Sequence, residues 1–151
     1  MIEDALNNAR EEDDSLVNEV GVELRHPQLN PGEYYLNVAR DPYFKFLSIL
    51  RHHIHAVSNV YFSEIVKARH MDLFLMTSSV SSPSGPGSDS EPIALTFGGH
   101  NTYLTDSSQF GFEPVLIGGI PRAYCYLASM RGENPDKRHL NQFYHCEYEA
   151  Q

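Results

Sequence analysis

The sequence contains few cysteines, no long apolar run and no excess of basic residues. Two cysteines, Cys125 and Cys146, cannot build a disulfide framework, and free thiols are typical of a cytoplasmic protein, which is the location we expect. No apolar run approaches the roughly 20 residues that span a bilayer, so we expect no membrane association. The first residues also lack the apolar segment of a signal peptide.

The net charge of −9 is concentrated near the N-terminus. Residues 1–33 hold nine acidic residues and two arginines, whereas residues 34–151 hold eleven acidic and nine basic residues. Because no basic patch stands out, we do not expect DNA as a partner. We interpret residues 1–41 as an acidic, turn-rich N-terminal segment and residues 42–151 as one folded domain.

The remaining pattern predicts an α+β protein with an antiparallel sheet flanked by helices. An N-cap at Asp41-Pro42 and apolar residues at steps of three and four predict a long amphipathic helix over 42–69. Shorter segments predict strands at 72–77, 93–97 and 102–104 and a helix at 106–118. Residues 123–130 and 142–149 predict an antiparallel hairpin.

The segment from residue 131 to residue 149 concentrates the polar and aromatic residues that could carry chemistry. The Arg131 guanidinium could bind a phosphate through two hydrogen bonds, and Phe143 could stack on a planar base. Glu147 and Glu149 are two residues apart, so they share one strand face and could hold an ammonium group. The same spacing also fits an ordinary surface hairpin with ion pairs, so spacing alone leaves both interpretations open.

Two segments resemble class II aminoacyl-tRNA synthetases, most closely the aspartyl and asparaginyl branch. RGENPDKRHLNQFYHCEYEA, residues 131–150, is similar to motif 2 of that family. YLTDSSQFGFE, residues 103–113, is similar to the element that begins the preceding helix. The resemblance is good over residues 90–150 and weak over residues 42–89. The resemblance implies part of the synthetase fold, with a sheet on which an amino acid reacts with ATP to give an aminoacyl adenylate.

The resemblance also implies the roles of residues toward ATP. Arg131 would contact the α-phosphate and the amino-acid carboxylate, and Glu133 would face the adenine or the tRNA end, so both are predicted catalytic residues. Arg138 and His139 would hold the outer phosphates, and Phe143 would stack on adenine. The tRNA is therefore a possible partner.

The resemblance implies an amino-acid site formed by Gln109, Glu113 and Glu147. Gln109 and Glu147 would hold the α-ammonium group. Phe112 stands where aspartate-specific relatives have a lysine, whereas the asparagine enzymes share an acidic residue at Glu113. The predicted substrate is therefore asparagine or a similar neutral amino acid that bears an amide.

Some family features have no counterpart in these residues. Motif 3, which supplies a second ATP-binding arginine and nearby acids for Mg²⁺, is missing, so most Mg²⁺ ligands are expected outside this chain. His52, His53 and His55 on the long predicted helix are too few for a metal site, and none is predicted. We therefore predict an incomplete catalytic core, weak or inactive alone, that pairs with itself or with a partner chain.

Two alternative functions stay open at this point. The chain could be a synthetase-derived binding or regulatory module that performs no chemistry. It could also be a ligase that forms an amide without tRNA, as the archaeal asparagine synthetases related to this branch do.

Overall fold

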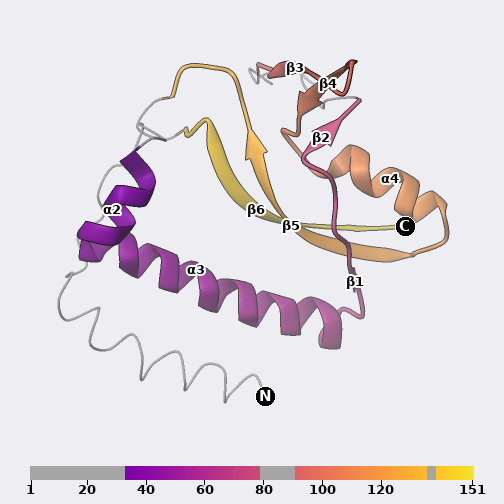
Figure 1. Cartoon of the computed structure of the whole chain (residues 1–151). Helices are drawn as coiled ribbons and strands as arrows, with labels where there is room; N and C mark the ends of the chain where they lie inside the picture. Colours follow the sequence, from indigo (N-terminus) through magenta and orange to yellow (C-terminus); the bar gives the residue numbers. More distant parts are fainter. Residues whose placement is uncertain (1–32, 79–90, 136–138) are drawn as a thin grey trace. The chain divides into compact units, whose positions relative to one another are not determined.

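The computed structural model describes residues 33–78, 91–135 and 139–151 (Figure 1). It contains helices, one mixed sheet and one antiparallel sheet, which confirms the predicted α+β class. The chain divides into two compact units, residues 1–66 and residues 67–151. Most of the acidic N-terminal segment, residues 79–90 and Arg138 lie outside the described residues. Within the described ranges, no helix is both long and apolar enough to span a bilayer.

The described part of the first unit is helical. It consists of α2 (Tyr34–Arg40), α3 (Pro42–Val60) and the π-helical segment η2 (Tyr61–Ile65). The Asp41 side chain accepts a hydrogen bond of 3.0 Å from the Tyr43 amide, which confirms the predicted helix start. The helix ends at Ile65 rather than at residue 69, because Lys67 takes a left-handed φ of 59° and the chain then enters a strand. Helix α2 was not predicted.

The larger sheet of the second unit has the strand order β1-β5-β6. Strands β5 (Arg122–Met130) and β6 (Gln142–Ala150) form the predicted antiparallel hairpin. Strand β1 (Arg69–His70) pairs with β5 in parallel, so the prediction of a purely antiparallel sheet is wrong here. The long connection from β1 to β5, which includes the second sheet and a helix, makes this parallel pairing possible.

The smaller sheet has the order β2-β4-β3 and is antiparallel. Strands β3 (Ala94–Phe97) and β4 (His100–Leu104) are joined by two glycines, Gly98 and Gly99, with φ of 57° and 81°. Positive φ at both positions is the geometry of a tight hairpin turn, so β4 begins earlier than predicted.

The predicted buried strand at 72–77 is wrong. Only β2 (Met76–Thr77) is a strand, and the Phe74 side chain is 89% exposed. The run is apolar, but it connects the two sheets, and only Leu73 packs against the core.

The core of the second unit lies between α4 (Gln109–Ile117) and one face of the larger sheet (Figure 1). Phe112 is 0% exposed and packs with Ala123, Cys125 and Leu127 of β5. Alternate residues of a strand share a face, so the α4 side of β5 also carries Ser129. The β5–β6 register places four residues of β6 on this same face: Phe143, His145, Glu147 and Glu149. We call this surface the site face.

Candidate functional site

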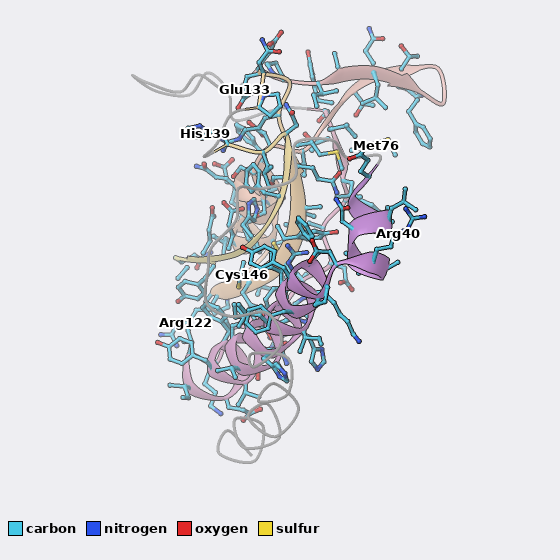
Figure 2. The ribbon with its side chains drawn as sticks, turned by 90° about the vertical axis from the view of Figure 1, so that its left-hand side faces the viewer. Arg40, Met76, Arg122, Glu133, His139 and Cys146 are labelled. Carbon is cyan, nitrogen blue, oxygen red and sulfur yellow. The ribbon has the colours of Figure 1, made fainter. Side chains whose placement is uncertain are left out.

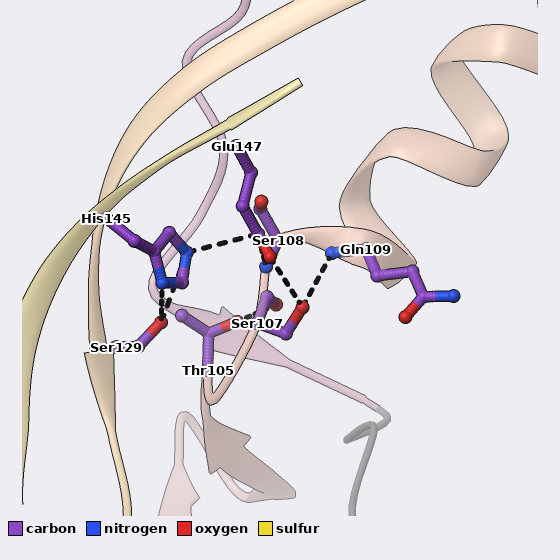
Figure 3. A network of polar contacts seen from close by, with 7 residues as sticks. All are labelled: Thr105, Ser107, Ser108, Gln109, Ser129, His145 and Glu147. Atoms are coloured by element: carbon purple, nitrogen blue, oxygen red, sulfur yellow. Dashed lines mark hydrogen bonds and ion pairs between the residues drawn. The ribbon is translucent and has the colours of Figure 1, made fainter. Parts of the chain in front are cut away.

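Glu147 is the centre of a polar network on the site face (Figure 3). Its Oε2 accepts a hydrogen bond of 2.6 Å from the Ser108 amide, and its Oε1 accepts one of 3.2 Å from the Ser107 hydroxyl. The Nε2 atom of His145 lies 3.0 Å from Oε2. Burial works to raise the pKa of Glu147, but these donors, led by His145, together hold that pKa below its usual value. The site therefore presents an ionised carboxylate.

His145 connects this carboxylate to the buried strand β5. The Ser129 hydroxyl oxygen lies 3.3 Å from Nδ1 of the ring and 3.4 Å from Nε2. A serine, an imidazole and a carboxylate in this order are the components of a hydrolase triad. Ser129 is 0% exposed, however, so its oxygen cannot reach a substrate. We interpret the network as a support for Glu147.

A second set of interacting side chains lies where the two hairpin strands meet the connection between them. The Arg131 guanidinium carbon is 5.0 Å from the centre of the Phe143 ring, which is a cation–π distance. The Nε atom of Arg131 is buried and has no hydrogen-bond partner. Leaving such a donor unpaired costs about 1–3 kcal/mol. Arg131 as a whole is only half-buried, unlike Ser129, so an anionic acceptor that contacts the guanidinium would be favoured.

Asn141 holds the backbone around Arg131. Its carbonyl oxygen accepts a 2.8 Å hydrogen bond from the Arg131 amide, and its side-chain amide donates to the Arg131 carbonyl at 2.9 Å. The same side-chain amide also donates to the Glu133 carbonyl. These contacts fix the points at which the chain leaves β5 and enters β6.

Glu133 contacts the backbone of Glu91, which precedes β3 in the chain. Its Oε2 accepts a 2.9 Å hydrogen bond from the Glu91 amide, and the Gly132 amide donates to the Glu91 carbonyl at 2.7 Å. A Cβ atom at position 132 would lie 3.1 Å from that carbonyl oxygen, so glycine permits the close approach. The predicted role of Glu133 toward adenine or tRNA stays a prediction.

The structure brings together only some of the residues that were predicted to bind the amino-acid substrate. Gln109 begins α4, and Figure 3 shows its side chain directed away from Glu147. Its backbone amide joins the network through a 3.2 Å hydrogen bond to the Ser107 hydroxyl. Burial, and then the negative charges of Glu147 and Glu113, raise the pKa of Glu149. The three carboxylates therefore lie close enough to interact electrostatically.

The predicted ATP residues gather near the hairpin loop. Arg131 and Phe143 are in contact, and Figure 2 shows Glu133 and His139 toward the end of the hairpin opposite Arg122. Arg138 lies outside the described residues, so its predicted contact with phosphate stays a prediction.

Four residues of the site face network escaped the sequence-based prediction: Ser107, Ser108, Ser129 and His145. The alternation of Phe143, His145 and Glu147 along one strand could have pointed to His145. Ser129 could not be found in this way, because its position beside the ring depends on the β5–β6 register.

Among the described residues, no group of three or more histidines, cysteines, aspartates and glutamates is arranged to hold a metal ion. Comparison with known proteins adds no assignment: no family model matches the chain, and no curated protein matches it.

Proposed function

We propose that the protein binds an amino acid and ATP on the site face and activates the amino-acid carboxylate as an adenylate. One observation carries the proposal: the same face presents an ionised carboxylate, Glu147, and a guanidinium with an unpaired buried donor, Arg131. Phe143, beneath Arg131, and Glu147 are four residues apart on one strand, or about 13 Å at 3.3 Å per residue. That separation suits an amino acid joined to a nucleotide better than an amino acid alone.

The Glu147 end fits the ammonium group of the substrate. The Glu147 side chain is 33% exposed, so a ligand can reach it from solvent. Phe112 fills the core at the position where a lysine could have paired with an acidic substrate. Glu113 adds negative charge nearby, which disfavours aspartate. The proposed substrate is therefore asparagine or a similar neutral amino acid that bears an amide.

The Arg131 end fits the nucleotide. Arg131 would bind the α-phosphate and the amino-acid carboxylate, while Phe143 would stack on adenine and His139 would contact the outer phosphates. A carboxylate oxygen of the amino acid attacks the α-phosphorus, and the bond from that phosphorus to pyrophosphate breaks. The step needs positioning and neutralisation of charge more than a general base. Mg²⁺, when bound to ATP, supplies part of that neutralisation. The adenylate would then pass to tRNA, or to ammonia or an amine.

One observation favours a non-catalytic binding module as the second candidate. The Arg131 guanidinium lies over the Phe143 ring, where adenine would stack. The nucleotide must therefore displace this contact, which costs about 0.5–1 kcal/mol for an exposed cation–π pair. A module that keeps the contact would bind the amino acid without using ATP.

Calorimetric titration with ATP and with L-asparagine tests the proposal. We expect both ligands to bind. Arg131→Ala should weaken ATP binding by roughly tenfold or more, because a charged hydrogen-bond donor is lost. His100→Gln, on the exposed turn of the smaller sheet, is the matched control and should leave both affinities unchanged. Binding of asparagine without ATP would favour the binding module, and binding of neither ligand would reject both candidates.

A further inference from the structure

His145 occupies a position that the proposed chemistry does not by itself require. Its ring lies between the Ser129 hydroxyl and the Glu147 carboxylate, at 3.3 Å from Nδ1 and 3.0 Å from Nε2 respectively (Figure 3). The His145 side chain is 19% exposed and the Glu147 side chain is 33% exposed. The imidazole is therefore the more buried partner, and the carboxylate is the more accessible one.

The hydrogen bonds are consistent with a neutral imidazole. A ring that donates from Nε2 to Glu147 leaves Nδ1 as an acceptor for the Ser129 hydroxyl, so one tautomer satisfies both neighbours. Glu147 then receives hydrogen bonds from Ser107, Ser108 and His145. A carboxylate can accept about four hydrogen bonds, so one position is left for a ligand.

Protonation of the ring would change the charge of this pair. With a neutral imidazole, Glu147 offers a full negative charge to an ammonium ligand. With an imidazolium, the pair has no net charge, and the ring competes with the ligand for the same carboxylate. Ser129 can accept a hydrogen bond from the protonated ring, so the network holds the ring in place in both states.

Acidic groups of the described residues also interact with Glu147. Glu147 interacts electrostatically with Cys125 of β5 and with Cys146 and Glu149 of β6, and it contributes to raising the pKa of each. Glu113 of α4 acts on Glu149. Since these groups are neutral or negative, none of them can replace His145 as a switchable positive charge beside Glu147. The positive charge of Arg131 lies over the Phe143 ring, which is 5.9 Å from the His145 ring, and it does not change with pH in this range.

We infer that His145 is a positioning residue that fixes the Glu147 carboxylate and makes its affinity for a ligand ammonium group depend on pH. The inference rests on the proposed function, because it takes Glu147 as the ammonium site. Affinity for the amino acid should be highest when the ring is neutral and should fall as the ring gains a proton on acidification.

Titration calorimetry with L-asparagine between pH 5.5 and pH 8 tests this inference. In the wild-type chain, we expect the affinity to fall by roughly fivefold toward the acid end, the upper value for a partly exposed ion pair. His145→Gln, which can still donate to Glu147, should remove this dependence, whereas His100→Gln should keep it. An equal pH profile in the wild type and in His145→Gln would overturn the inference and leave the proposed function standing. No binding of asparagine at any pH would overturn both.

Histidine NMR of the wild-type chain gives a second test that does not require a variant to fold. The His145 ring donates to the same carboxylate that would hold the ammonium ligand, so saturating asparagine should shift the His145 ring resonances and leave those of His100 in place. His145 resonances that are unchanged by bound asparagine would contradict the inference.

Discussion

The two strands of the hairpin have the same length and pair along their whole extent, yet they differ in what they contribute. Strand β5 lies between β1 and β6, and five of its nine residues are buried. Strand β6 alternates exposed and half-buried residues and has no fully buried one. The comparison teaches that the central strand supplies the packed support, whereas β6 presents the groups that can meet a ligand.

The largest expected effect comes from removing the packing behind β5. Phe112→Ala should lower the free energy of unfolding by about 3–5 kcal/mol, because the ring is 0% exposed and packs on three β5 side chains. Phe97→Ala is the matched control on the smaller sheet, where the ring is 60% exposed, and it should cost less than about 1 kcal/mol. Urea denaturation measures both. Equal costs would mean that α4 does not anchor the hairpin.

The next prediction concerns two acidic residues of β6, whose contributions to folding stability should change with pH in opposite directions. The lowered pKa of Glu147 means that its contribution to stability is present above about pH 4.3, the ordinary glutamate value, and is lost as pH falls through the lower folded-state value. Glu147→Gln should therefore cost about 1 kcal/mol near pH 7, and this cost should shrink in acid.

Glu149 should behave in the opposite way. Its raised pKa means that its contribution is present below about pH 4.3 and is lost as pH rises through the higher folded-state value. Glu149→Gln should thus stabilise the chain slightly near pH 7 and have less effect in acid. Thermal unfolding of both variants from pH 3.5 to pH 7.5 measures the two slopes. Slopes of the same sign would contradict this account of the network.

The last effect, similar in size to that of Glu147→Gln, concerns the boundary between the strands. Asn141→Ala removes the side-chain hydrogen bonds to the carbonyls of Arg131 and Glu133, which should cost about 1 kcal/mol or slightly more. Because the backbone of Arg131 loses a constraint, the affinity for ATP should fall more than the affinity for asparagine. Asn101→Ala on β4 is the control. Equal losses for the two ligands would show that Asn141 does not act through Arg131.

The parts of the fold that depend on neighbouring residues were predictable from the sequence. The Asp41-Pro42 cap located the start of α3, and the two strand-like segments at 123–130 and 142–149 located the hairpin. The parallel pairing of β1 was not predictable, because it depends on a long connection. The apolar run that ends in Met76 looked like a buried strand, yet the structure uses it as a connection between sheets.

The candidate site was predictable to a similar degree. Phe143, Glu147 and Glu149 of β6 were found from their spacing and from the resemblance, both of which need only local sequence. The support of Glu147 by Ser107, Ser108 and His145 brings β6 together with the segment that precedes α4. The stacking of Arg131 on Phe143 likewise requires the two strands to be paired. Such contacts depend on the register of the paired strands, which could not be predicted from the sequence.

The most direct measurement is the exchange of labelled pyrophosphate into ATP, with and without L-asparagine. Our account predicts weak exchange that requires asparagine, is not supported by aspartate, persists in His100→Gln and disappears in Arg131→Ala. Exchange no greater in the wild type than in Arg131→Ala, in a chain shown to bind asparagine, would contradict the proposal of amino-acid activation.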